Sequence, residues 1–259
     1  MQLLSRIACF GVAAMLVAPG ASAAQPPLTA QAFSLSNFHE ETEETFPARL
    51  PTQLTVLSDS SGVTRIGLDS FAGMATIYSG GDTPAYSIYH LSMQLSALVG
   101  YKITGFAFSG DLAGVLDPAQ APDGYPYGTP GIARNLAWAN LGALSAGGQR
   151  HDYASGDRTD VNGASQIGFQ SNGAFLPNEL SLAFNAGVNA KTAGSYFADA
   201  EGNEIRVPSY ASIRILNPVL TIYSAALPVP EPDIWMMLLA GLALPWAVRR
   251  ARKRSQAAL

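Results

Sequence analysis

The chain has little of the chemistry on which most enzymes and metal proteins depend. It contains one cysteine, Cys9, and three histidines in 259 residues. A single cysteine excludes a disulfide framework and a zinc site made of several cysteines. Charged residues account for only 13% of the sequence, about half the usual share, whereas apolar residues account for an ordinary 48%. This balance excludes a chain that is disordered throughout, which requires low hydrophobicity and high charge.

The net charge of −4 is unevenly distributed along the chain. Residues 24–230 carry nine basic and seventeen acidic side chains, whereas residues 1–23 carry one basic side chain and residues 231–259 carry five basic and two acidic ones. An acidic body excludes a nucleic-acid-binding protein that is basic overall, so we expect no nucleic-acid partner. The two basic ends are interpreted as segments with roles separate from that of the acidic body.

Residues 1–23 have the pattern of a secretory signal peptide. Arg6 provides a positive start, residues 7–18 form an apolar run, and Ala21 and Ala23 give the small-x-small site of signal peptidase. A buried first helix or a membrane anchor is the alternative. Cleavage before Ala24 would remove the only cysteine, so the mature chain would have no thiol and no disulfide.

The C-terminus has three parts in a fixed order. A proline-bounded motif is followed by residues 234–248, an uncharged apolar run with a tryptophan near each end, and then by a basic cluster. As a helix the run would span roughly 22 Å, short of the ~30 Å hydrocarbon core of a bilayer. The basic cluster would stay cytoplasmic and act as a stop-transfer signal, which places the body on the far side of the inner membrane. The motif is Val229, Pro230, Glu231 and Pro232, and the cluster is Arg249, Arg250, Arg252, Lys253 and Arg254.

These three parts together resemble the PEP-CTERM sorting signal of Gram-negative bacteria, here over residues 228–254. The resemblance implies processing near the Pro-Glu-Pro motif by an exosortase, a membrane-embedded protease or transpeptidase. It also implies an exported protein that ends at the cell surface or outside the cell, in bacteria that make exopolysaccharide and biofilm. An ordinary C-terminal tail anchor is the alternative.

Residues 31–225 are expected to form one mainly β domain. Runs rich in Thr, Ile, Val, Tyr and Phe alternate with Gly, Asp, Asn and Pro about every ten residues, which is typical of an antiparallel β-sandwich of jelly-roll or Greek-key type. An N-terminal signal helix would precede this domain, and a C-terminal transmembrane helix would follow it. Strands are expected at 53–57, 64–68, 74–78, 86–95, 101–108, 165–169, 179–185, 210–216 and 219–223, with a break at Asn217-Pro218. A short helix at 132–144, a surface loop at 117–131 and a second, mobile connection at 188–209 complete the prediction.

Few residues suggest catalysis. The histidines, His39, His90 and His151, lie far apart and match no metal-ligand spacing, and no Gly-x-Ser-x-Gly elbow follows residue 23. We therefore expect no enzyme and name no catalytic residue. The acidic run at 40–44 is interpreted as a solvated segment or exposed turn.

Two weak binding signals remain. Asp157, Asp160 and Asn162 offer oxygen ligands of the kind that calcium prefers, but Asx-rich turns have the same composition without any metal. No other cofactor is indicated. Tyr125 and Tyr127, in a loop rich in proline and glycine, could offer flat rings to sugars, or could fold back over the core.

Two functional classes stay open. The first is a non-catalytic surface or matrix protein that takes part in adhesion or in exopolysaccharide association. The second is a secreted polysaccharide hydrolase, which would need two convergent carboxylates roughly 5–10 Å apart in a cleft.

Overall fold

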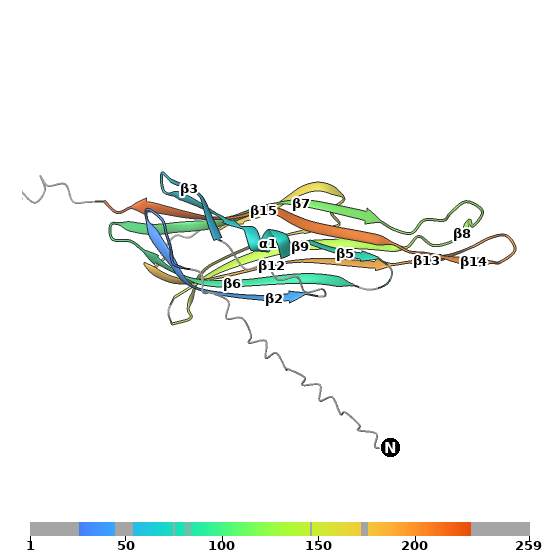
Figure 1. Ribbon diagram of the computed structural model, residues 1–259, viewed down its shortest axis with the longest axis horizontal. Helices are drawn as coiled ribbons and strands as arrows, with labels where there is room; N and C mark the ends of the chain where they lie inside the picture. The colour runs from blue at the N-terminus through green and yellow to red at the C-terminus, as the bar shows by residue number, and fades with distance from the viewer. Residues whose placement is uncertain are drawn as a thin grey trace, which may run out of the picture.

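The computed structural model describes residues 26–44, 54–74, 76–80, 82, 84–145, 147–171 and 176–228. They form two antiparallel sheets packed face to face, with a small third sheet at one end (Figure 1). The first strand begins at Leu28 and the last ends at Ala226. The expected antiparallel β-sandwich is confirmed. The signal helix and the transmembrane helix predicted for the two ends lie outside the described residues.

Sheet A has the strand order β1-β2-β6-β12-β9-β10. Its strands alternate between apolar residues that face the other sheet and mostly polar or small residues that face outward, as in β6, where every second residue from Tyr89 to Leu95 is buried. The strands are β1 (Leu28–Thr29), β2 (Phe33–Glu44), β6 (Ala85–Ala97), β12 (Glu179–Ala193), β9 (Ile132–Leu144) and β10 (Arg150–Thr159).

Sheet B has the order β11-β7-β15-β4-β3, and β5 also pairs with β15. The long strand β15 therefore has two successive partners on one side, β5 along its first part and β4 along its second. The strands are β11 (Gly163–Gln170), β7 (Tyr101–Asp117), β15 (Tyr210–Ala226), β4 (Val63–Leu68), β3 (Leu54–Ser60) and β5 (Thr76–Gly80).

The chain crosses between the sheets from β2 to β3, from β5 to β6, from β6 to β7, from β7 to β9, from β10 to β11, from β11 to β12 and, through the third sheet, from β12 to β15. The resulting orders, β4/β5-β15-β7-β11 facing β6-β12-β9-β10, are those of a jelly roll, in which two Greek keys are wound together. Strands β1, β2 and β3 extend the two sheets at their edges.

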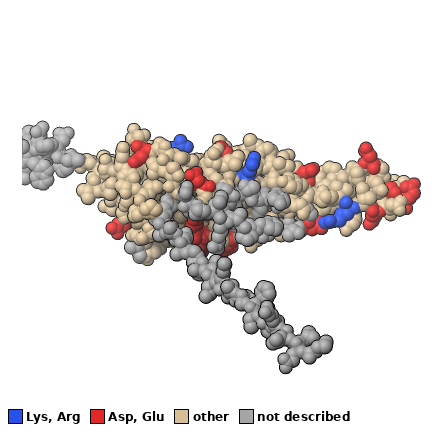
Figure 2. All heavy atoms as spheres, viewed as in Figure 1, with Lys and Arg blue, Asp and Glu red and all other residues tan. Residues whose placement is uncertain are grey.

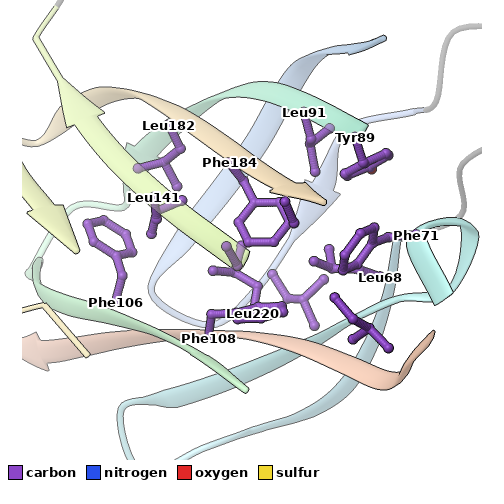
Figure 3. Packing of buried hydrophobic residues seen from close by; sticks show 14 of the residues in the cluster. Leu68, Phe71, Tyr89, Leu91, Phe106, Phe108, Leu141, Leu182, Phe184 and Leu220 are labelled. Atoms are coloured by element: carbon purple, nitrogen blue, oxygen red, sulfur yellow. The ribbon is translucent and has the colours of Figure 1, made fainter. Parts of the chain in front are cut away.

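The core lies between the sheets and is centred on a group of aromatic rings (Figure 3). Helix α1 (Asp69–Met74) joins β4 to β5, and it places Phe71 between the sheets with 1% of its surface exposed. The ring centroid of Phe71 lies 5.2 Å from that of Tyr89, 5.9 Å from Phe184 and 6.4 Å from Phe108. Helix α1 therefore lies where the pairing partner of β15 changes from β5 to β4.

Several sequence-based expectations for local structure are wrong. Residues 132–144 form strand β9 and not a helix, because the buried residues Ala137, Ala139, Leu141 and Ala143 alternate there with outward residues at a period of two. Residues 188–209 are not a mobile connection, because β12 continues to Ala193 and is followed by β13 (Ser195–Ala198) and β14 (Glu204–Val207). The acidic run at 40–44 is part of β2, paired with β6, and not an exposed turn, although Glu41 and Glu43 are exposed as expected for a solvated segment.

The predicted break at Asn217-Pro218 is a bulge within a continuous strand. Asn217 has a φ of 49°, and the pairing register with β7 shifts between Leu216 and Val219. A bulge accommodates a proline that cannot donate to the ladder, so β15 continues on both sides of it.

The third sheet extends one end of the molecule, in the order β14-β13-β8, where β8 is Tyr127–Gly128 (Figure 1). The expected surface loop at 117–131 therefore includes one short strand. Among the described residues, no helix is long and apolar enough to cross a membrane.

Candidate functional site

A row of polar side chains crosses the outer face of sheet A. The pairing registers place five residues from five adjacent strands side by side on this face. Directly opposed residues in an antiparallel sheet have Cβ atoms about 5 Å apart, so neighbouring members can touch. We call this the polar row; from β2 to β10 it consists of Glu41, His90, Asn185, Asn140 and Ser155.

The centre of the polar row is fixed by hydrogen bonds. The Asn185 side-chain amide donates to Oδ1 of Asn140 over 3.0 Å, and its own Oδ1 lies 2.7 Å from Nδ1 of His90. All three side chains are partly exposed. Each amide has both donor and acceptor capacity, so it can serve a ligand as well as its neighbour.

Next to the polar row lies an indole ring. Trp138 of β9 is paired with Gly187 of β12, and a Cβ atom at Gly187 would fall 2.8–2.9 Å from Nε1, Cε2 and Cζ2 of the indole. The ring therefore extends from its own strand across the neighbouring one, in the space that the glycine leaves open. Asp157 of β10, exposed and directly opposite Trp138, places a carboxylate beside the ring.

On the other side of the polar row the surface is lined by small residues. The three central positions there are Ser92, Ala183 and Gly142, and nothing lies within 4 Å of a Cβ atom built at Gly142. The same row ends in His39 on β2 and Tyr153 on β10. Tyr153 is 50% exposed, and the Arg150 guanidinium lies 5.1 Å from its ring centroid.

We use the name trough for this set of outward-facing residues on sheet A: amides and small residues in the middle, with Trp138 and Tyr153 as the aromatic residues. The two aromatic positions are roughly 14 Å apart, from the rise along a strand and the spacing between strands. A hollow of about 240 Å³ continues the trough beyond Ser92, lined in part by Asn37, Gln94 and Ser181. The Asn37 side-chain amide donates to Gln94 Oε1 over 2.7 Å.

The tyrosines named from the sequence lie elsewhere, at the end of the molecule that carries the third sheet. Tyr125 is half-buried, and its N–H donates to the Pro122 carbonyl, whereas Tyr127 is 61% exposed. Tyr127 is paired with Ala198, so it shares a sheet face with Tyr196, which is also 61% exposed. The sugar contact predicted for Tyr125 and Tyr127 stays a prediction.

This end also carries acidic side chains (Figure 2). Asp199, at the β13–β14 turn, accepts hydrogen bonds from the backbone N–H groups of Glu201 and Asn203 and from the Asn203 amide. The hydrogen bonds from Asn203 are the main reason that the pKa of Asp199 lies below its usual value. This carboxylate organises its own turn.

The calcium candidates have separate partners. Asp157 faces outward beside Trp138, the Asp160 carboxylate lies 3.8 Å from the Arg134 guanidinium, and Asn162 Oδ1 accepts from the Leu116 N–H over 3.4 Å. Within the part of the chain that the structure describes, no three His, Cys, Asp or Glu side chains are grouped so as to hold a metal ion. Calcium binding stays a prediction.

Of the three histidines, two belong to the trough and the third lies near it, on β10. His90 is in the polar row, His39 Nε2 lies 3.1 Å from the Glu41 carboxylate at its rim, and His151 is exposed. Glu40 alternates with these outward residues and points toward the interior, where burial raises its pKa. Its hydrogen-bond partners are Ser70 and Tyr89, not a second carboxylate.

The sequence-based search missed Trp138, Asn140 and Asn185 and gave His90 no role. They come from three strands that are not consecutive in the chain, and one of these strands had been expected to be a helix. A period-two interpretation of 132–144 would have placed Trp138 and Asn140 on one outward face.

The signal-peptidase site at Ala21, Ala23 and Ala24 lies outside the described residues. So do the sorting motif and the basic cluster of the C-terminus.

Fold and site define a jelly-roll β-sandwich with an aromatic and polar trough on one sheet. No family model and no curated protein matches the chain. Among solved structures it is similar to TmCBM61, a carbohydrate-binding module solved with β-1,4-galactotriose, with a TM-score of 0.24 and 9% identity over 68% of this chain and 89% of that one. A DUF4465 family protein from Bacteroides caccae gives a TM-score of 0.16 and 10% identity over 70% and 92%. Scores this low carry no argument about function.

Proposed function

We propose that this protein is an exported, non-catalytic surface or matrix protein that binds polysaccharide in the trough of sheet A. The observation that carries the proposal is the Trp138 indole, seated over Gly187 beside the hydrogen-bonded row of His90, Asn185 and Asn140. A sugar ring has an apolar C–H face, which stacks on an aromatic ring, and hydroxyls that both donate and accept hydrogen bonds. The trough offers both kinds of partner side by side.

The arrangement is also pre-organised. Ordering free side chains on binding costs about 0.5–1.5 kcal/mol for each rotamer-rich side chain. The hydrogen bonds among His90, Asn185 and Asn140 already fix these side chains in the absence of a ligand. The position of Trp138 is likewise set by the packing of its ring over Gly187.

The terminal signals supply the route in this proposal. Signal peptidase would release the chain before Ala24, the C-terminal run would hold it in the inner membrane with its basic tail in the cytoplasm, and an exosortase would process it near Pro230-Glu231-Pro232. The mature protein would then act at the cell surface or in the extracellular matrix, with exopolysaccharide as its partner.

The test is a binding measurement on purified exopolysaccharide and on a panel of neutral and charged glycans. Trp138→Ala and Asn185→Ala should each lower the affinity, the first by about 30-fold, since a buried tryptophan in a binding site contributes about 2 kcal/mol. Val115→Ala and Ser109→Ala, which change exposed residues of β7 in sheet B, are the matched controls and should bind like the wild type.

Two results would contradict the proposal. One is the absence of binding to every glycan tested. The other is the release of reducing ends from the polysaccharide during incubation, which would indicate the hydrolase alternative. Deletion of residues 229–259 followed by cell fractionation tests the route separately, because an unchanged distribution would mean that the C-terminal signal is not read.

A further inference from the structure

Exposed aliphatic side chains gather at one end of the sandwich. Val99, in the turn between β6 and β7, is fully exposed (102% of its reference area), and Leu98 beside it is 38% exposed. Leu227, just after β15, is 41% exposed. Exposed aliphatic groups are unfavourable in water, so a cluster of them marks a surface that meets an apolar partner.

Backbone hydrogen bonds hold these residues in one place. The Leu227 N–H donates to the Gly100 carbonyl over 2.7 Å, and the Leu98 N–H donates to the Ala32 carbonyl over 2.8 Å. The chain therefore leaves the sandwich beside the turn that carries Val99. We call Leu98, Val99 and Leu227 the exit patch.

The length of chain beyond the patch limits what can lie opposite it. Five residues, 229–233, separate Pro228 from the apolar run at 234–248. Five residues span at most about 18 Å when fully extended. If the apolar run enters a bilayer, the exit patch cannot be farther from the membrane than this short tether allows.

We propose that the exit patch contacts the lipid surface of the membrane that holds the C-terminal run, with Val99 entering the interface. The proposal depends on the membrane insertion expected for residues 234–248, but not on polysaccharide binding. Lys102, exposed and paired with Ala225 on β15, lies beside the patch and supplies a cation for anionic headgroups. A small apolar patch held close to an inserted segment can add to membrane binding, because the segment already keeps the patch at the membrane surface.

This contact would set the orientation of the whole sandwich. The exit patch and the third sheet lie at opposite ends of the long axis (Figure 1). The long axis would then rise from the membrane, with Tyr196 at the far end and the trough of sheet A on the side of the molecule.

The absence of cysteine after residue 9 makes a direct test possible. The chain that begins at Ala24 is reconstituted into vesicles of phosphatidylethanolamine and phosphatidylglycerol with one cysteine, labelled with an environment-sensitive fluorophore, at each of four positions in turn. Val99→Cys tests the patch, Val115→Cys and Tyr196→Cys are exposed controls along the long axis, and Ala240→Cys reports insertion of the C-terminal run.

The proposal expects a blue-shifted emission at position 99 that is quenched by lipids spin-labelled near the headgroup. Positions 115 and 196 should show the emission of a probe in water, without quenching. Emission at position 99 equal to that at position 115 overturns the proposal. Lack of quenching at position 240 by lipids spin-labelled deep in the acyl chain also overturns it, because the apolar run would then not be inserted and the tether would not be anchored. Either result leaves the polysaccharide proposal standing.

Discussion

The packing of the Trp138 indole over Gly187 of β12 gives a prediction that distinguishes an effect on ligand affinity from an effect on folding stability. In Gly187→Ala the new methyl group would lie 2.8–2.9 Å from three atoms of Trp138, closer than carbon and nitrogen atoms approach without overlap. The backbone of β12 is held by β6 and β9 on either side, whereas the indole is at the surface. We therefore expect the ring to move and the strand to stay.

The expected energies differ for stability and affinity. Overpacking costs about 1–3 kcal/mol, and at the surface the low end applies. The alanine offsets about 0.4–1 kcal/mol of this by restricting the unfolded chain. The free energy of unfolding should thus change by about 1 kcal/mol or less, while loss of the tryptophan position should weaken polysaccharide binding by about 30-fold.

The assay uses a background with Trp235→Phe and Trp246→Phe, in which Trp138 is the sole indole. Gly187→Ala should shift the tryptophan emission, with a urea midpoint close to that of the background protein. Gly80→Ala is the matched control, because nothing lies within 4 Å of its added Cβ atom and it belongs to sheet B. Unchanged emission and unchanged affinity in Gly187→Ala would refute both the packing of Trp138 over Gly187 and the role of Trp138 in polysaccharide binding.

Three further predictions concern stability. Phe71→Ala should lower the free energy of unfolding by about 3–5 kcal/mol in urea melts, because it empties the centre of the aromatic core, and a loss under 1 kcal/mol would contradict that placement. Asn135→Ala should lower the free energy of unfolding by about 3 kcal/mol, because the Asn135 amide donates to the Val161 and Ser212 carbonyls and accepts from the Val161 N–H. Asn203→Ala, at an exposed position, should lower it by less. Burial raises the pKa of Glu40 above 4.5, so the folded state binds its proton more tightly than the unfolded state; this contribution to stability is complete below pH 4.5 and is lost as pH rises through the folded-state pKa. Glu40→Gln should thus be more stable than the wild type at pH 7. Equal changes in the melting temperatures of the two proteins between pH 4 and pH 7 would contradict this.

Local patterns were enough to predict the architecture. Residues 210–216 alternate apolar and polar side chains, and this region is the first part of β15. Residues 132–144 misled because alanine and leucine favour helices as well as buried strand faces, and only the packing between the sheets decides which applies.

The trough could not be predicted because it exists only through pairing registers. His90, Asn140 and Asn185 come together because β12 lies between β6 and β9, an order that reflects the crossings between sheets and not the order of the chain. The pairing of the acidic run at 40–44 with β6 could not be predicted for a related reason. A strand at the sheet edge can point Glu40 inward and Glu41 outward, whereas composition alone treats all carboxylates alike.

The position of β15 in sheet B determines when the protein can fold. In the described structure β15 is the common partner of β7, β4 and β5. Without it, β7 is paired only with β11, β4 only with β3, and β5 with no strand of sheet B. Because β15 ends at Ala226, a chain that emerges from its N-terminus first cannot close this sheet until nearly all of the body has appeared. In such a chain sheet B stays open until this last strand arrives.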